Sequence, residues 1–302
     1  MKAAVIHRYG GPNVLQYEDY PDPVAGAGEV LVRVAAAGVN PVDTFDRSGQ
    51  TKDWRPLQFP AVIGWDLAGT VASLGAGVKG FAVGERVLAW AYHTYAELCV
   101  VKSELLAKVP AGLELSQAAA LPLVGLTGSQ LVAVASGAKA GQTVLVSGAS
   151  GSVGRAAVFA ARELGARVIA GVRRAQLEAA AQLGADQLVA LDDPQALGRL
   201  APVDVVANTV RGKTAEQLLA RVRPGGVFAS VTGAPSNAKD FPAVRVVAFV
   251  SKQDSTALQH LADAAHEGRF LIPVDRRLPL KDAAVAHAAL EKGGVGKIVL
   301  QT

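Results

Sequence analysis

The chain has 302 residues, enough for about two domains, and half of the residues are hydrophobic while only 19% are charged, which excludes a disordered chain. The net charge is +4, and the only adjacent basic pairs are Arg173-Arg174 and Arg276-Arg277, so we expect no nucleic-acid partner. The single cysteine, Cys99, excludes an intramolecular disulfide and fits a reducing cytoplasm.

The first third of the chain has the pattern of a β-rich domain. Its N-terminal apolar run stops at His7-Arg8, which is too short for a signal peptide, so we expect a cytoplasmic protein. Short segments rich in Val, Leu and Ala then alternate with clusters of Gly, Pro and Asp. The expected strands are 2–7, 30–36, 67–74, 86–89 and 96–101. This pattern is typical of an irregular, mostly antiparallel β domain.

From Ser116 onward the pattern changes to helices that alternate with apolar strands. Helical segments over 116–136 are broken around Pro122 and Gly125, and polar residues interrupt them too often for a membrane span. The expected strands that follow are 143–147, 167–171, 187–191, 203–208, 226–232 and 245–250, and the expected helices are 153–164, 175–183, 194–200, 214–222 and 256–267. This alternation predicts an α/β fold with a doubly wound parallel sheet of about six strands.

After Phe270 the pattern changes again, to a strand over 272–278, a helix over 280–291 and a last strand over 297–300. We expect this tail to return to the first domain. The predicted division is therefore residues 1–111 with 268–302 in one domain, and residues 112–267 in the other.

The strongest chemical signal is a glycine-rich turn between the strand 143–147 and the helix that follows it. The turn and the helix start contain Gly148, Ser150, Gly151, Ser152, Val153 and Gly154. Glycines let the backbone approach a pyrophosphate, and the start of a helix favours its negative charge. Because a strand precedes the turn and a helix and a second strand follow, the pattern predicts a dinucleotide site.

The residues after the next strand indicate which dinucleotide binds. An NAD site usually has an acidic residue at this point, whereas this chain has Arg173 and Arg174. Guanidinium groups can bind a 2′-phosphate through paired hydrogen bonds. We therefore expect NADPH as the cofactor; the alternative is that both arginines are solvated residues at the start of a helix.

Taken together, these segments resemble the medium-chain dehydrogenase/reductase superfamily, in its zinc-free quinone oxidoreductase (zeta-crystallin-like) branch. The likeness is carried by Ala37-Gly-Val-Asn-Pro-Val-Asp43, Ile63-Gly-Trp-Asp-Leu-Ala-Gly69, Gly84-Glu-Arg-Val87, Gly125-Leu-Thr127, the turn from Gly148 to Gly154, and Gly296-Lys-Ile-Val299. The resemblance implies a GroES-like catalytic domain, made from both ends of the chain, and a Rossmann domain that binds NADPH.

Zinc alcohol dehydrogenases of this superfamily place a cysteine in the segment where Asn40 stands and a histidine where Trp65 stands. A carboxamide and an indole do not replace these zinc ligands. The histidines of the chain lie in unlike segments, at positions 7, 93, 260, 266 and 287. We therefore expect no metal, and a hydride transfer that uses none.

The resemblance also implies site residues. By this resemblance Asn40 lies beside the nicotinamide and the substrate; the alternative is that it serves only the turn before Pro41. Thr127 matches a cofactor-contacting threonine, with a helix cap as the alternative. Gly233 follows a late strand, where the chain should pass the nicotinamide ribose, with a simple turn as the alternative. Tyr92 is a candidate proton donor on a segment expected to face the cleft, and simple surface packing is its alternative.

Further expectations concern other aromatic positions and Leu191. Trp65 is interpreted as either a wall of an aromatic substrate pocket or a buried core residue. His93 and Tyr95 share the segment of Tyr92 and are expected to face the same cleft. Phe45 and Leu191 stand where relatives often have tyrosines, so those parts of the family pattern are not preserved.

The resulting hypothesis is an NADPH-dependent oxidoreductase that reduces quinones or related conjugated carbonyl compounds. The alternatives are an enoyl or acryloyl reductase of small unsaturated carbonyls, and a non-catalytic NADPH-binding sensor or structural protein. The resemblance further implies a homodimer formed through the edge of the Rossmann sheet.

Overall fold

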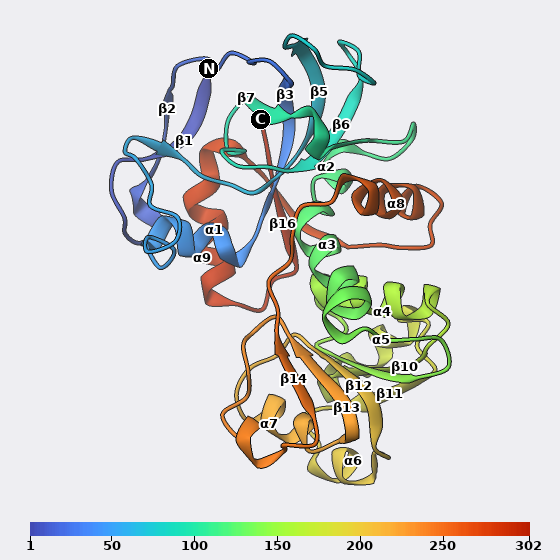
Figure 1. The fold of residues 1–302 in the computed structure, drawn as a ribbon. Coiled ribbons are helices and arrows are strands. Elements are labelled where there is room, and N and C mark those ends of the chain that lie inside the picture. The colour runs from blue at the N-terminus through green and yellow to red at the C-terminus, as the bar shows by residue number, and fades with distance from the viewer. The chain divides into compact units, whose positions relative to one another are not determined.

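The computed structural model describes residues 1–302, which form two compact units (Figure 1). The first unit consists of Met1–Leu123 and Gln253–Thr302, and the second consists of Val124–Lys252. The expected return of the C-terminal tail to the first domain is present, since the last strand, β16 (Lys297–Gln301), pairs antiparallel with β3 (Glu29–Val39).

The borders of the two units differ from those expected after residues 111 and 267. Helix α8 (Ser255–His266) lies in the first unit, not in the domain to which its place in the sequence assigned it. It packs against β8 (Leu106–Lys108), where the Gln259 amide donates to the Lys108 carbonyl (3.1 Å) and accepts from the Lys108 N–H (2.7 Å). Helical periodicity shows that a helix has an apolar face, but not which sheet that face covers.

The first unit contains two sheets. The smaller has the order β2-β1-β4, and the larger has the order β15-β16-β3-β5-β6-β8, with β7 also paired to β3. The remaining strands are β1 (Lys2–Ile6), β2 (Leu15–Asp19), β4 (Ala61–Val62), β5 (Asp66–Leu74), β6 (Arg86–Trp90), β7 (Leu98–Lys102) and β15 (Val274–Pro279). Most pairs are antiparallel, as the sequence predicts, although β2, β4 and β8 were not predicted.

Helices complete the first unit. They are α1 (Pro41–Ser48), α2 (Leu115–Ala118), α8 and α9 (Ala283–Lys292). Helix α1, absent from the prediction, has strong end signals: Pro41 is its first residue, the Asp43 carboxylate accepts from the Asn40 N–H (2.7 Å), and Gly49 ends it with φ 81°.

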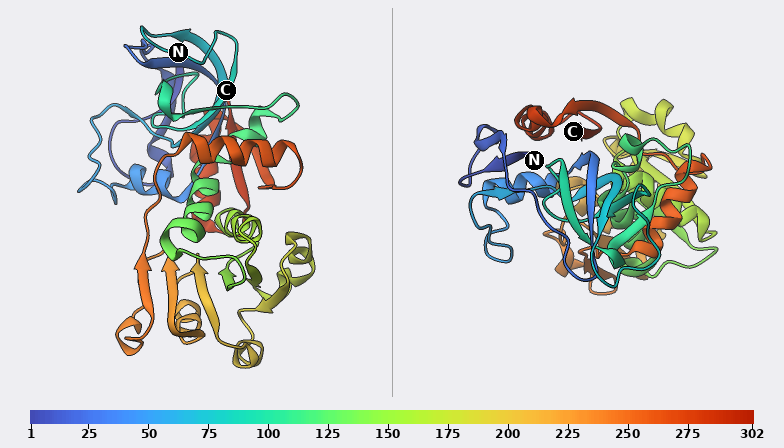
Figure 2. Two further views of the ribbon diagram at one scale, coloured as in Figure 1. Left: turned by 45° about the vertical axis from the view of Figure 1, so that its right-hand side comes forward. Right: turned by 90° about the horizontal axis from the view of Figure 1, so that it is seen from above.

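The second unit contains one six-stranded parallel sheet in the order β11-β10-β9-β12-β13-β14. Its strands are β9 (Thr143–Ser147), β10 (Arg167–Val172), β11 (Gln187–Ala190), β12 (Val203–Asn208), β13 (Val222–Ser230) and β14 (Arg245–Ala248). The left view of Figure 2 shows orange strands of this sheet side by side, with their arrowheads at the same end. The order reverses between β9 and β12, so the predicted doubly wound sheet is confirmed.

The helices of this unit are α3, which begins just before it (Pro122–Gln130), α4 (Ser152–Glu163), α5 (Leu177–Ala180), α6 (Pro194–Arg199) and α7 (Lys213–Leu219). A π-helical turn, Leu131–Ser136, continues α3. None of the helices in the chain combines the length and the apolar character that a membrane span requires.

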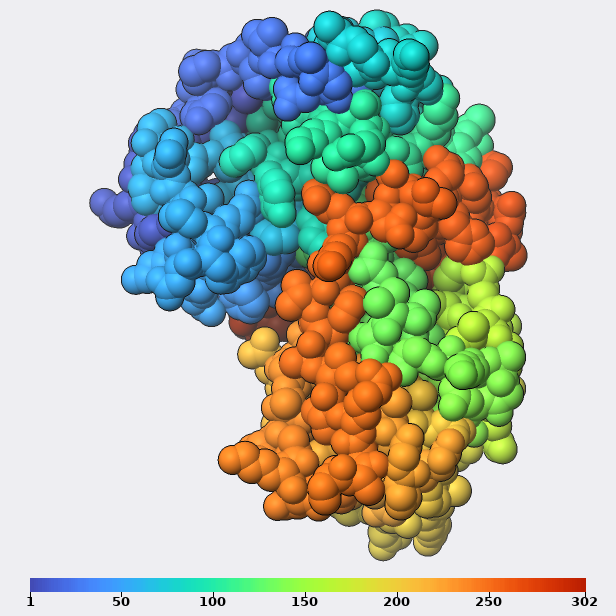
Figure 3. All heavy atoms as spheres, viewed as in Figure 1, coloured from blue at the N-terminus to red at the C-terminus, as the bar shows by residue number.

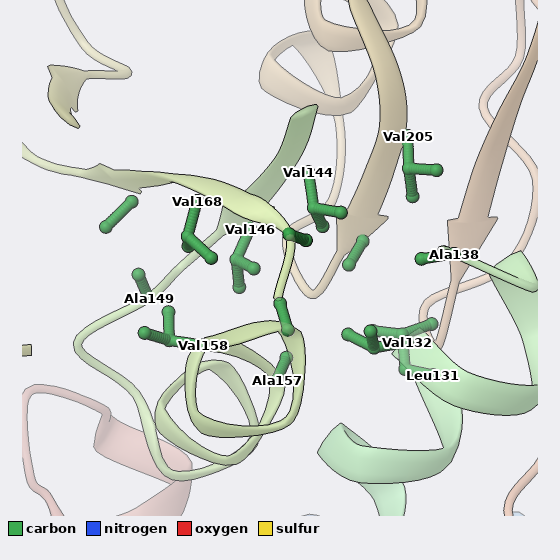
Figure 4. Close-up of a cluster of buried hydrophobic side chains, with 14 of the residues drawn as sticks. Leu131, Val132, Ala138, Val144, Val146, Ala149, Ala157, Val158, Val168 and Val205 are labelled. Atoms are coloured by element: carbon green, nitrogen blue, oxygen red, sulfur yellow. The ribbon is translucent and has the colours of Figure 1, made fainter. Parts of the chain in front are cut away.

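One face of the parallel sheet packs against α4 and the π-helical turn (Figure 4). Val144, Val146 and Val168 project from the central strands toward Ala157 and Val158 of α4. All five are essentially inaccessible to solvent. This buried apolar layer fixes the start of α4 against the end of β9, which is where the glycine turn lies.

The contact between α3 and α4 yields a test of this packing. A Cβ atom at Gly128 would lie 2.3 Å from the Val153 carbonyl oxygen, whereas one at Gly198, an exposed glycine of α6, would meet no atom within 4 Å. We expect Gly128→Ala to lower the unfolding temperature by several degrees, and Gly198→Ala to leave it unchanged or raise it, since alanine favours helix by about 1 kcal/mol. Thermal unfolding followed by circular dichroism measures both. Two shifts of the same sign would contradict the close approach of α3 and α4.

Candidate functional site

The glycine turn of the second unit is built from backbone constraints. Gly148 has φ 62°, a left-handed conformation, and its carbonyl accepts from the Gly151 N–H (2.9 Å). A Cβ at Gly154 would lie 2.1 Å from the Gly148 carbonyl oxygen, so only glycine lets α4 begin this close to the turn. The turn therefore has the geometry that the sequence predicted.

The start of α4 is open to a ligand. No side chain caps the helix, and Gly151, its N-cap residue, is exposed. The N–H groups of the first turn therefore point outward without a side-chain acceptor. The Ser150 hydroxyl next to them is buried and has no protein partner. These donors fit an anionic group such as the pyrophosphate of a dinucleotide.

A network of small polar side chains lies at the carboxyl ends of the central strands. The Ser147 hydroxyl donates to Asn208 Oδ1 (2.8 Å), and Asn208 Nδ2 donates to the hydroxyls of Ser230 (3.0 Å) and Thr232 (3.2 Å). The network joins β9, β12 and the end of β13 at the point where the strand order reverses. Sequence reasoning missed it, although a polar residue at the end of each of these apolar strands was a usable signal.

The two arginines after β10 differ in their surroundings. Arg174 pairs with Asp193, and its backbone N–H donates to Asp192 Oδ1 (2.7 Å). The Arg173 guanidinium has only a long contact with Gln176 Oε1 (3.5 Å) and is exposed. Both side chains are on the surface, but only that of Arg173 lacks an acidic partner.

Thr127 and Gly233 lie in different settings within this unit. Thr127 stands inside α3 and shares a hydrogen bond with the Ser251 hydroxyl (2.8 Å), so it is not a helix cap. Gly233 is exposed with φ 92°, and a Cβ there would meet nothing. Leu191 is buried, and a Cβ on Gly171 would lie 2.8 Å from Leu191 Cδ2, so a larger residue at 171 would displace the Leu191 side chain.

In the first unit, Asn40 is fully buried in a polar cluster. Its Nδ2 donates to Asp66 Oδ2 (2.8 Å), and its Oδ1 accepts from Lys297 Nζ (2.6 Å). Lys297 also pairs with Asp66 (3.1 Å), whose other oxygen accepts from the Leu123 N–H (2.8 Å). Burial raises the pKa of Asp66, while Lys297, Asn40 and the Leu123 N–H act in the opposite direction. Asn40 thus has a structural role that the sequence did not reveal, and Lys297 and Asp66 were not predicted.

Beside this cluster runs a second buried chain of hydrogen bonds. The Tyr95 hydroxyl donates to Asp43 Oδ2 (2.9 Å) and contacts His287 Nε2 (3.2 Å). Burial raises the pKa of Asp43 to about 8 and lowers the pKa of His287 to about 3, the latter with help from the charge of Arg47. Tyr95 is completely buried, so the prediction that it faces a cleft is wrong.

Trp65 is the centre of an aromatic cluster. Its indole N–H donates to Asp46 Oδ2 (2.6 Å), and its ring stacks on Trp90 (5.8 Å between centroids) and meets Tyr92 edge-on (5.0 Å). Trp65 is 5% exposed, which favours the core interpretation over a pocket wall. Trp54, 63% exposed, meets Trp65 edge-on at 6.4 Å.

Tyr92 remains accessible, with 37% of its surface exposed. The Arg55 guanidinium lies 3.8 Å from the centroid of the Tyr92 ring, and Arg55 also pairs with Asp46 (2.7 Å).

Phe45, which replaces a tyrosine common in relatives, is half-buried. The chain has no group of three or more His, Cys, Asp or Glu side chains arranged to hold a metal ion.

The fold and the turn together define a dinucleotide-binding protein with a separate β-rich domain, and comparison with known proteins agrees. The chain matches the family described as zinc-binding dehydrogenase over residues 183–300, and the alcohol dehydrogenase GroES-like domain over residues 26–111. A quinone oxidoreductase of Pseudomonas aeruginosa is 33% identical, with 93% of each chain covered, and a 2-haloacrylate reductase of a Burkholderia species is 32% identical over 99% of this chain and 98% of that protein.

A solved structure, that of Escherichia coli quinone oxidoreductase complexed with NADPH, superimposes with a TM-score of 0.87 at 28% identity and covers 100% of both chains. The chain belongs to the medium-chain dehydrogenase/reductase superfamily, in the branch of the quinone oxidoreductases. The predicted family and the GroES-like and Rossmann architecture are confirmed.

The buried acid Asp43 makes stability depend on pH. Its folded pKa of about 8 lies above its ordinary value of 3.8, so its contribution to stability falls as pH rises through this interval. His287 acts oppositely, because its folded pKa of about 3 lies below 6.5 and its contribution rises with pH between these values. Above pH 6.5 the His287 effect is complete, and the raised pKa values of Asp43 and Asp66 both make stability fall as pH rises.

We expect the free energy of unfolding, measured by urea titration, to fall by about 2 kcal/mol between pH 6.5 and 8. The variant Asp43→Asn keeps an oxygen acceptor for the Asn40 N–H but cannot ionise, so its free energy of unfolding should fall clearly less over this range. An equal fall in the variant would assign the effect to another group.

Proposed function

We propose that the protein is an NADPH-dependent oxidoreductase that reduces quinones or related conjugated carbonyl compounds by hydride transfer without a metal. The observation that carries this proposal is the uncapped start of α4 beside the turn from Gly148 to Gly154, with an unpaired guanidinium at the end of the neighbouring strand. The quinone oxidoreductases among its relatives support the reaction class.

Within the second unit, the backbone of Gly151, Ser152 and Val153 would bind the pyrophosphate, with the Ser150 hydroxyl as a further donor. Gly148 and Gly154 make room for it. Thr127 and Gly233 are proposed as contacts nearer the nicotinamide. When bound, NADPH supplies the hydride, while the chain holds it in place.

Arg173 is the proposed partner of the 2′-phosphate, because its guanidinium is exposed and has no acidic partner. Arg174 contributes less, since Asp193 already neutralises it. An exposed ion pair of this kind is worth little and can exchange, so Arg174 can still approach the phosphate.

In the first unit, Asn40 and Tyr92 are the proposed residues of the acceptor half of the reaction. Lys297 and Asp66 hold both ends of the Asn40 amide, so its orientation is fixed before any ligand binds. The Tyr92 ring is accessible, and its hydroxyl is the proposed donor of the proton that must follow the hydride. Arg55 lies over the same ring and would stabilise negative charge that develops on the phenol oxygen.

The second candidate is an enone reductase of small unsaturated carbonyl compounds, which the 2-haloacrylate reductase among the relatives favours. The hydride geometry is shared, and the shape of the acceptor site separates the two reactions.

We also propose a homodimer that pairs through the exposed edge strand β14. The single cysteine supports a cytoplasmic location, which we propose as well.

The roles of the two arginines give a prediction with an internal control. We expect Arg173→Ala to weaken NADPH binding about tenfold or more and NADH binding by less than twofold, as the loss of a charged phosphate contact should. Arg174→Ala should have a smaller effect on NADPH. Titration of nicotinamide fluorescence with each variant measures this. Equal losses for NADPH and NADH would contradict the 2′-phosphate role.

The reaction itself is tested by adding an acceptor to the protein with bound NADPH. We expect rapid loss of nicotinamide fluorescence with 1,4-benzoquinone or 9,10-phenanthrenequinone, and slower loss with small enones. A faster reaction with enones would favour the second candidate. Binding of NADPH with no oxidation by any acceptor would contradict an enzymatic role.

A further inference from the structure

The first unit has a half-open cavity of about 750 Å³, and its lining includes Tyr92 and Arg55 of the proposed acceptor half but neither Asn40 nor any of the proposed cofactor contacts. Its walls come from the segment after β2, the loop between α1 and β4, and the segment before and within β7. The lining residues that matter below are Tyr20, Arg55, Phe59, Val62, Tyr92 and His93. Figure 3 shows a hollow on this face, between the dark-blue atoms near the N-terminus and the light-blue atoms of the loop after α1. The volume lies within the range of small-molecule sites.

The walls are mainly aromatic. Phe59 is 39% exposed and Tyr92 is 37% exposed, which places both among the few large apolar side chains of the chain that remain accessible. The Tyr20 hydroxyl donates to the Pro60 carbonyl (3.1 Å) and so joins the two sides of the cavity. Arg55 covers one face of the Tyr92 ring at 3.8 Å and is held there by Asp46. These groups offer a preformed surface for a planar ring.

His93 supplies the polar group. It is the only non-glycine residue of the chain with a positive φ, 64°, a conformation that costs energy and is often kept at functional sites. Its Nδ1 lies 2.7 Å from the Val62 carbonyl oxygen, which can only accept, so Nδ1 carries the proton. In the neutral ring Nε2 is then an acceptor, and it has no partner in the protein.

We propose that this cavity binds a planar phenol, a class that includes hydroquinones. The aromatic walls take the ring, and His93 Nε2 accepts the hydroxyl proton in a hydrogen bond. His93 is exposed, so water can donate to Nε2 in the free protein; a bare aromatic ring would displace that water without offering a donor in its place. The site therefore selects for the hydroxyl group and not merely for apolar character.

The test uses two probes that differ in that one group. Binding of 4-fluorophenol and of 4-fluoroanisole is followed by fluorine NMR at pH 8, without NADPH. We expect 4-fluorophenol to bind in the millimolar range or tighter, and 4-fluoroanisole to bind about tenfold more weakly, as the loss of one hydrogen bond predicts. Equal affinities, or no binding of 4-fluorophenol at about 10 mM, would overturn the proposal.

The variant His93→Asn locates the site. Asparagine tolerates the left-handed conformation, so the loop should keep its shape while the Nε2 acceptor is lost. We expect about tenfold weaker binding of 4-fluorophenol to this variant, with no change for the control His7→Asn, an exposed histidine paired with Glu18 elsewhere in the unit. Unchanged binding to His93→Asn would show that the phenol binds elsewhere.

A second variant tests the cavity as the binding site without a substitution in the loop that carries His93. Leu98→Trp, in the cavity wall contributed by β7, should fill part of the space and weaken both probes together. Undiminished binding of both probes to this variant would contradict a site in the cavity. Because these measurements use no NADPH, their failure is distinguishable from failure of the proposed reductase activity.

Discussion

The buried ion pair between Lys297 and Asp66 is the interaction on which the first unit depends most. Taking two charges out of water costs several kcal/mol, and the cost is offset only where every remaining donor and acceptor is satisfied. Here the Asn40 amide and the Leu123 N–H provide those partners. The cluster thereby joins the C-terminal strand β16 to β5 and to the start of α1, so both ends of the chain are needed to form one domain.

The position of this cluster bears on function because Asn40 and Trp65 stand in the segments where zinc alcohol dehydrogenases have metal ligands. In this chain the Asn40 amide binds an ammonium and a carboxylate, and the Trp65 indole donates to Asp46. At the positions of Asn40 and Trp65 the chain thus has hydrogen-bonded side chains whose chemistry differs from that of zinc ligands. The second unit has no comparable ion pair; neutral hydroxyl and amide groups, centred on Asn208, join its strand ends.

The sequence predicted best where the structure is determined locally. The strand β9, the glycine turn and α4 follow one another within a few residues, and each has an unambiguous pattern. Helix α1 was missed because the residues that it buries include Asp43, Asp46 and Arg47, so no apolar periodicity marks it. The partners of two of them lie far along the chain, Tyr95 for Asp43 and Glu291 for Arg47, and no local pattern shows such pairs. For the same reason the burial of Tyr95 could not be foreseen.

The account's central claim is that this chain transfers hydride from NADPH to an electron-poor acceptor without a metal. The most direct measurement is the rate of NADPH oxidation by 1,4-benzoquinone before and after exhaustive dialysis against EDTA, with the zinc content determined on the same samples. The account predicts an unchanged rate in protein that contains no stoichiometric zinc. A rate that is lost on dialysis and restored by added zinc would contradict it.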